Sequence, residues 1–126
     1  MNENRIKSFT DLIVWQKGHI FVVDLYRVTD TFPKKEIFGL VSQLRRAGVS
    51  FTSNIAEGYS RESYKERVKF YFIALGSLYE IQNQLLIARD VGYLQVNEFE
   101  NLIDKTIELT KMTNGLIKKT KSFLNF

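Results

Sequence analysis

Few residues of this 126-residue chain are of the types that do chemistry, and their spacing matches no catalytic motif. His19 is the only histidine and stands on an apolar stripe, so a Ser/His/Asp triad would have to centre on it. A di-iron bundle needs a Glu-x-x-His pair on each of two helices, whereas Gln16 stands three residues before His19. Cysteines and phosphate-cradling glycine loops are absent from the sequence. We therefore expect no enzyme activity, no metal site and no cofactor.

Two lines of polar residues recur at intervals of three and four, the spacing of one helical face. Their members are Gln43, Arg46, Ser50, Asn54 and Glu57 in the first line, and Ser77, Glu80 and Gln84 in the second. If the lines meet, Arg46 can pair with Glu80, and Asn54 with Ser77 or with backbone. Buried polar groups are tolerated only when bonded, so we interpret the lines as a structural polar seam, with a ligand site as the alternative. The seam residues proper are Gln43, Asn54, Glu57, Ser77 and Glu80.

The chain is mildly basic, with 18 Lys and Arg against 14 Asp and Glu and a sequence pI near 9.3. Each phosphate that a basic side chain neutralises releases counterions, so repeated Lys and Arg suit an anionic partner. Simple solvation is the alternative explanation of each charge. The candidates for nucleic-acid binding are Arg45, Arg46, Arg61, Lys65, Lys69, Lys118, Lys119 and Lys121.

Apolar residues with helical period predict the elements that position these side chains. A single Pro and only seven Gly leave few interruptions, so the helices are expected to be long. Phe32 and Pro33 end the first helix, because the residue before a proline is pushed out of helical geometry. Gly58 and Gly92 are the predicted ends of the second and third. The predicted ranges are about 11–30, 34–57 and 63–91, with a fourth helix from Asn97.

Two pairs of residues have the spacing of a capping box and predict helix starts: Ser63 with Glu66, and Asn97 with Glu100. Each helix then carries a stripe that we expect to face the core. The predicted inner faces are Leu12, Trp15, His19, Val22 and Tyr26; Leu40, Leu44, Ala47, Phe51 and Ile55; Val68, Phe72, Leu75, Tyr79 and Leu86; and Leu102, Thr106, Leu109, Thr113, Leu116 and Thr120.

Short connections between long helices favour antiparallel neighbours, which predicts an all-α, up-down-up-down four-helix bundle. We expect residues 1–126 to form one such domain, since the length is ordinary for a single domain. The runs 20–23 and 70–73 place large apolar groups on more than one helical face. Either the four helices cover these groups or the chain associates with copies of itself.

No signal peptide or membrane span is expected, because residues 1–9 lack an apolar core and the longest uncharged run, 70–79, is too short for a bilayer. The absence of cysteine permits a reducing compartment. We expect a cytoplasmic location.

Three stretches carry a family resemblance: DLIVWQK at 11–17, FPKKEIFGLVSQLRRAGVSFTSNIAEGYSR at 32–61, and FYFIALGSLYEIQNQLLIARDVGYL at 70–94. They resemble the bacterial four-helix bundle family of 23S ribosomal RNA intervening-sequence proteins, above all in the words NIAEG and ALGSLYE. The resemblance covers almost the whole chain. Residues at the family's motif positions are Trp15, Gln43, Arg46, Asn54, Glu57, Gly58, Gly76, Ser77 and Glu80.

This resemblance implies a four-helix bundle, a ring-like homopentamer and no established enzymatic activity. The accessory variability proteins of diversity-generating retroelements are similar to the family and bind nucleic acid beside a reverse transcriptase. Our leading hypothesis is therefore a noncatalytic homo-oligomer that binds RNA or DNA through basic surface residues. The alternative is a protein-interaction adaptor with no nucleic-acid contact, to which exposed aromatic residues such as Phe123 and Phe126 would contribute.

Overall fold

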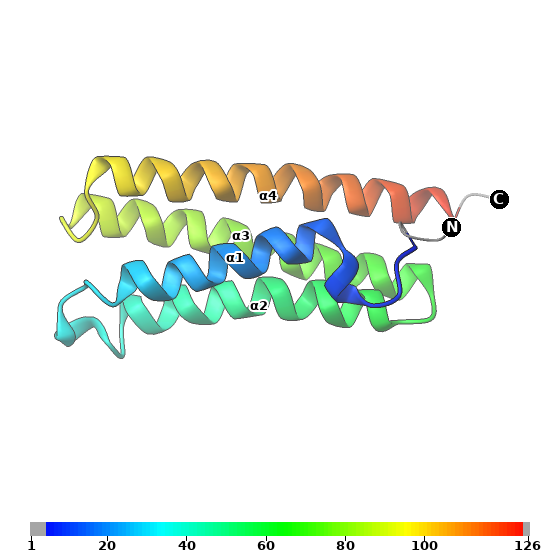
Figure 1. The fold of residues 1–126 in the computed structure, drawn as a ribbon, viewed down its shortest axis with the longest axis horizontal. Helices are drawn as coiled ribbons and strands as arrows, with labels where there is room; N and C mark the ends of the chain where they lie inside the picture. Colours follow the sequence, from blue (N-terminus) through cyan, green and yellow to red (C-terminus); the bar gives the residue numbers. More distant parts are fainter. Residues whose placement is uncertain (1–4, 125–126) are drawn as a thin grey trace.

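The computed structural model describes residues 5–124, and every regular element in this part of the chain is a helix. Four long α-helices follow one another, with a short 3-10 helix before each of the first two (Figure 1). The elements are η1 Phe9–Asp11, α1 Ile13–Thr29, η2 Lys34–Glu36, α2 Leu40–Ser60, α3 Tyr64–Asp90 and α4 Val96–Ser122. The prediction of an all-helical fold with four long helices is confirmed. None of the helices in the described residues is both long and apolar enough to pass through a lipid bilayer.

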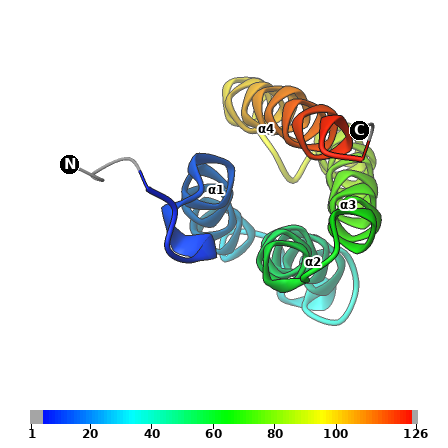
Figure 2. The ribbon, with the colours of Figure 1, turned by 90° about the vertical axis from the view of Figure 1, so that its right-hand side faces the viewer.

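Each helix packs on the next one along the chain, and α1 also contacts α4. Figure 1 shows the chain turning back at each connection, so that its colours run in opposite directions along consecutive helices. In the end view of Figure 2 the helices follow one another in the order α1, α2, α3, α4. The end of α2, the start of α3 and the end of α4 thus lie at the same end of the molecule.

Both predicted ends of α3 are confirmed. The Ser63 hydroxyl oxygen accepts a 3.0 Å hydrogen bond from the backbone N–H of Glu66, which satisfies a donor that the first turn leaves free. After α3, Gly92 takes a φ of +88°, a conformation that glycine adopts without steric penalty.

Both predicted ends of α2 are wrong. The residues after Pro33 form η2, and α2 begins only at Leu40, whose N–H donates a 3.2 Å hydrogen bond to Glu36 Oε1. That carboxylate satisfies the free donor of the true helix start. Gly58 does not stop the helix but lies buried inside it, and α2 continues to Ser60.

The predicted cap of α4 is also displaced. Asn97 and Glu100 lie inside the helix, and the capping box is formed two residues earlier by Gln95 and Glu98. Both pairs have the same spacing, so the sequence pattern predicts a capping box but does not determine which pair forms it.

The core lies between the four helices, and two of the predicted inner faces are confirmed. On α2 the side chains of Leu44, Phe51 and Ile55 are fully buried. On α4 the stripe from Leu102 to Thr120 is buried apart from the half-buried Leu116. Its threonines are satisfied within the helix. Hydroxyl groups donate to backbone carbonyls three or four residues earlier at Thr106, Thr113 and Thr120.

The predicted inner face of α3 is wrong at three of its five residues. Phe72, Tyr79 and Leu86 are 47%, 52% and 40% exposed. The buried face instead includes Leu78 and Ile81. Apolar residues surround α3 almost completely, so its periodicity fits two stripes equally well. On α1, likewise, His19 and Tyr26 are exposed, whereas Phe21 and Leu25 are buried.

Candidate nucleic-acid interface

Six of the eight predicted basic residues lie at one end of the molecule, where α2 ends, α3 begins and α4 ends (Figure 1). Contacts between side chains of α3 and the end of α4 show this proximity. The Lys121 ammonium lies 5.0 Å from the centre of the Phe72 ring, and the rings of Tyr64 and Phe123 are 5.0 Å apart. We call this region the basic end. Its predicted members are Arg61, Lys65, Lys69, Lys118, Lys119 and Lys121.

The lysines of the basic end are free to meet an anion. All five are exposed, and none has a carboxylate oxygen within 4.0 Å among residues 5–124. Arg61 differs, because its guanidinium pairs with Glu57 at 3.2 Å. Beside Lys118 and Lys121 a hollow of about 480 Å³ opens between α3 and α4. The basic end therefore offers several ammonium groups that no carboxylate of residues 5–124 pairs, around a shallow depression.

Aromatic rings lie among these charges, a feature that the sequence analysis missed. The Arg61 guanidinium stands 4.6 Å from the centre of the Phe70 ring, and Lys121 faces Phe72. Arg67, which was not among the predicted residues, stands over Tyr59 and Tyr64 and donates a 2.7 Å hydrogen bond to the carbonyl of Arg61. Exposed rings beside cations are the usual platform for unpaired bases. The signal was present in the sequence as five aromatic residues in the stretch 59–72.

Arg45 and Arg46 lie apart from the basic end. They are in the second turn of α2, and the 15 residues from Arg46 to Arg61 correspond to about 22 Å along a helix. Arg45 is fixed in place, since it stands over the Tyr26 ring at 4.6 Å and donates to Thr29 Oγ1 and Asp30 Oδ1. It therefore joins α1 to α2 and is not a free cation.

The two predicted polar lines do meet, between α2 and α3. The Ser77 hydroxyl donates a 2.9 Å hydrogen bond to Ser50 Oγ, and the Asn54 amide donates to the Ser50 carbonyl oxygen at 2.8 Å. Arg46 and Glu80 form no ion pair among the described residues, and Glu57 pairs with Arg61 instead of joining the seam. Gln43 is exposed at the rim.

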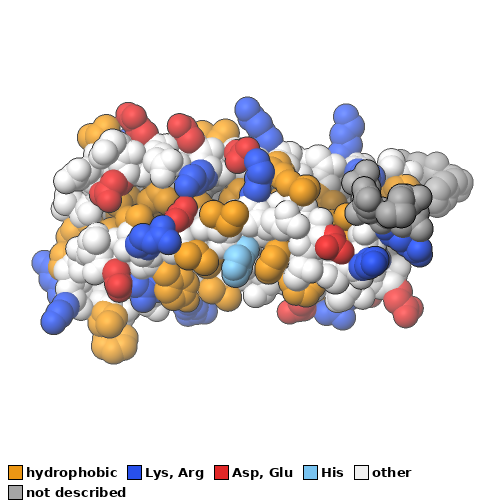
Figure 3. Space-filling view, in the orientation of Figure 1, with side chains coloured by type: hydrophobic (Ala, Val, Ile, Leu, Met, Phe, Trp, Pro, Cys, Tyr) orange, Lys and Arg blue, Asp and Glu red, His pale blue; other side chains and the backbone are white. Residues whose placement is uncertain are grey.

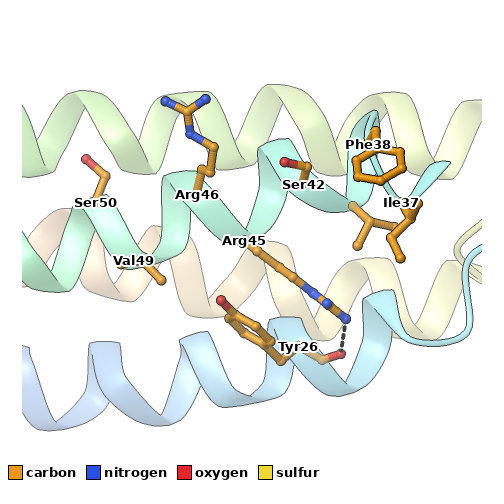
Figure 4. A pocket seen from close by; sticks show the side chains of 9 residues that line it. Tyr26, Ile37, Phe38, Ser42, Arg45, Arg46, Val49 and Ser50 are labelled. Atoms are coloured by element: carbon orange, nitrogen blue, oxygen red, sulfur yellow. Dashed lines mark hydrogen bonds between the residues drawn. The ribbon is translucent and has the colours of Figure 1, made fainter.

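Another hollow lies on the other side of α2, between α2 and α1, and has a volume of about 600 Å³ (Figure 4). Phe38, which is 94% exposed, stands at one end of it with Ile37. Figure 4 shows Arg45 reaching down to Tyr26, whereas Arg46 and Ser50 point toward α3. Most of the remaining lining is apolar. The lining residues are Tyr26, Ile37, Phe38, Val41, Ser42, Arg45, Arg46, Val49 and Ser50.

The titratable residues in the part of the chain that the structure describes form no metal-binding group. No three His, Asp or Glu side chains gather there in a way that could hold a metal ion. His19 is exposed, and its ring stacks on Trp15 at 4.9 Å. On the face seen in Figure 3, positive and negative side chains alternate among apolar ones, as on an ordinary solvated surface.

Comparison with known proteins adds two findings. A family model described as 23S rRNA-intervening sequence protein matches residues 10–115. The crystal structure of a protein of unknown function from the S23 ribosomal protein family of Bacteroides thetaiotaomicron has a similar fold, with a TM-score of 0.78. The two sequences are 22% identical, and the alignment covers 84% of this chain and 96% of that chain. Comparison with curated proteins gives no match.

Proposed function

The chain belongs to the family of 23S rRNA-intervening sequence proteins, and from this premise we propose a function for it. It is a noncatalytic, cytoplasmic homo-oligomer that binds RNA or DNA through basic surface residues. The observation that carries this proposal is the basic end, where exposed lysines of α3 and α4 surround exposed aromatic rings. An antiparallel, up-down-up-down bundle is its scaffold, because that topology brings the start of α3 beside the end of α4.

Several phosphate contacts are needed for useful affinity, and one protomer offers few of them. Self-association multiplies the number of basic ends in one particle. The homopentamer implied by the family resemblance would present five copies. Nucleic acid that contacts several copies at once is bound more tightly than the affinity of one copy predicts.

The outward face of α3 supports self-association. Its residues recur at alternating intervals of four and three, which is the spacing of a helix–helix seam. Three are large and apolar and 40% or more exposed, and the polar Asn83 stands where coiled coils often set register. We call this face the α3 stripe. Its members are Phe72, Gly76, Tyr79, Asn83 and Leu86.

Titration of a structured RNA and of a duplex DNA at several salt concentrations tests the proposal. We expect binding at low salt and a linear fall of log K with log salt. The double variant Lys65→Ala/Lys69→Ala should reduce the slope by about 1 for each lost phosphate contact. The matched control, Lys34→Ala/Lys35→Ala, removes the same charge at the opposite end of the molecule and should keep the slope. Absent binding at low salt, or equal effects of both variants, would contradict the proposal.

A second candidate function is that of an adaptor for another protein, and Phe38 is the observation that favours it. The Phe38 ring is 94% exposed and lies beside the 600 Å³ hollow. A large apolar ring on the surface is a typical anchor of a protein–protein interface. Of the two aromatic residues named from sequence, Phe123 packs on Tyr64, and Phe126 lies outside the described residues. Copurification with a candidate partner protein, such as a reverse transcriptase, tests this function. Phe38→Ser should abolish the complex, and Ile13→Ser on the exposed side of α1 should not.

A further inference from the structure

A smaller hollow lies in the groove between α2 and α3 and has a volume of about 350 Å³. Its lining is almost entirely polar, in contrast to the hollow beside Phe38. The side chains come from the two polar lines of the sequence. The lining residues are Gln43, Arg46, Ala47, Ser50, Glu80 and Gln84.

Gln84 forms the buried wall of this hollow. Its side chain is only 8% exposed, and its Oε1 atom accepts no hydrogen bond from any residue that the structure describes. A buried carbonyl oxygen without a donor is destabilising and requires an explanation. The neighbouring hydroxyl groups are satisfied, since Ser77 donates to Ser50. The groove therefore has one buried acceptor without a donor among the described residues, which a donor from a bound group would satisfy.

Charged groups stand on both walls of the hollow without neutralising each other. Figure 4 shows Arg46 pointing from α2 toward α3, and Glu80 lines the hollow from α3. Both residues are exposed, and no ion pair within 4.0 Å joins them. Glu80 and Gln84 are one helical turn apart on the same wall. The α2 wall thus donates hydrogen bonds, and the α3 wall accepts them.

An unpaired guanine base has the complementary pattern. Its N1–H and N2–H groups are neighbouring donors, which one carboxylate can accept together, and its O6 and N7 atoms are acceptors that an arginine contacts as a pair. The Watson–Crick edges of adenine, cytosine and uracil have no two adjacent donors. Unpaired bases in RNA loops are free to present this edge to a protein.

We propose that the hollow between α2 and α3 binds an unpaired guanine of the RNA whose backbone the basic end holds. Glu80 accepts from N1–H and one N2–H, Arg46 donates to O6, and Gln84 accepts the other N2–H. This inference rests on the proposed function. The phosphate contacts of the basic end carry no base preference, and the guanine site adds one.

Fluorescence anisotropy with short RNAs tests the preference. The probes are uridine strands of about ten nucleotides that carry one central guanosine, adenosine, cytidine or inosine. Inosine is the sharpest of them, because it lacks only the N2 amino group. We expect the wild type to bind the guanosine strand roughly tenfold more tightly than the other three. Glu80→Gln should remove the preference, whereas Glu100→Gln, which changes an exposed carboxylate of α4, should keep it.

Titration with guanosine monophosphate gives a readout that needs no polynucleotide. The NMR signal of the Gln84 side-chain amide, identified by its loss in Gln84→Leu, should shift in the wild type and not in Glu80→Gln. Equal affinity for the four RNAs together with an unmoved amide signal overturns the guanine site. If the guanine site fails this test but Lys65→Ala/Lys69→Ala still weakens RNA binding, the proposed function stands without the guanine site. A shift of the Gln84 amide signal in a protein that binds none of the four RNAs supports the guanine site and overturns the proposed function.

Discussion

The Tyr93 hydroxyl donates a 2.7 Å hydrogen bond to Glu36 Oε2, while Oε1 of the same carboxylate accepts the N–H of Leu40. The two residues are 57 positions apart in the chain, and Glu36 thereby joins η2 to the α3–α4 connection and caps α2. The Tyr93 bond, followed by the Leu40 bond, holds the pKa of Glu36 below its usual value. The same contact raises the pKa of Tyr93.

Tyr93→Phe should flatten the pH dependence of stability at both extremes. Because the pKa of Glu36 is lowered in the folded state, its carboxylate stabilises the fold at pH values above the pKa of the unfolded chain. This stabilisation is lost as the pH falls through the pKa of the folded state. The raised pKa of Tyr93 means that its contribution is present below its unfolded pKa and is lost as the pH rises through the folded pKa. Urea unfolding from about pH 3 to about pH 11 measures both losses. Tyr64→Phe is the control, and identical pH profiles of wild type and Tyr93→Phe would contradict this account.

Gly58→Ala should destabilise the fold, because α2 and α3 meet closely at this glycine. A Cβ atom there would lie 2.7 Å from Tyr71 Cε1 and 2.9 Å from Phe70 Cβ. The Tyr71 ring is itself buried and the Phe70 contact is to a Cβ atom, so we expect a loss of about 1–3 kcal/mol in the free energy of unfolding. Gly115→Ala on α4 is the control. Its Cβ would meet nothing within 4 Å, and it should stabilise the helix by about 0.5–1 kcal/mol. Chemical denaturation measures the free energy of unfolding of both variants, and equal changes in the two would contradict the prediction.

Asp24→Asn should weaken the contact between α1 and α4. The Asp24 carboxylate is 20% exposed and accepts hydrogen bonds from Arg27 at 2.8 Å and from Lys105 of α4 at 2.9 Å. We expect a loss of less than about 1 kcal/mol, which added salt reduces. Glu108→Gln, which breaks the more exposed pair with Lys17, is the comparison and should cost less. Thermal melts at low and high salt measure the difference, and a salt-independent loss would be evidence against an electrostatic cause.

Tyr79→Glu should disrupt the proposed homo-oligomer without unfolding the protomer. Tyr79 lies in the middle of the α3 stripe and is 52% exposed, so a charge there costs little in a single chain but much in a contact between copies. Light scattering should give the mass of an oligomer for the wild type and 14.7 kDa for the variant, with unchanged helix content by circular dichroism. Ile13→Glu on α1 is the control and should remain oligomeric. A wild type that is monomeric at every concentration would refute the proposed assembly.

The inner faces of α2 and α4 were predictable because each has one apolar stripe, represented by Phe51 and Leu109. On α3 the stripes through Phe72 and through Leu78 obey the same period, and only the positions of α2 and α4 determine which is buried. The start of α2 was missed for a related reason. Glu36 caps this helix from outside, with support from Tyr93, a contact that no local pattern reveals.

The candidate site shows the same division between local and distant information. Lys65 and Lys69 share a helical face by their spacing alone, whereas the contact of Lys121 with Phe72 follows from how α3 and α4 pack. Arg45 and Arg46 are adjacent in sequence and yet differ in environment. The rotation of about 100° per residue turns one toward Tyr26 of α1 and the other toward α3.

The attachment of α1 has a consequence for how the molecule opens. This helix has 17 residues against 21, 27 and 27 in the others, and it faces α4 through the ion pairs Lys17–Glu108 and Asp24–Lys105 beside a hollow of about 170 Å³. We therefore expect α1 to detach more readily than the longer helices, so backbone amides of α1 should exchange with deuterium before those of α3. While α1 is detached, its own Phe21 and Leu25 would be exposed to solvent, and the three remaining helices would stay packed as a cooperative unit.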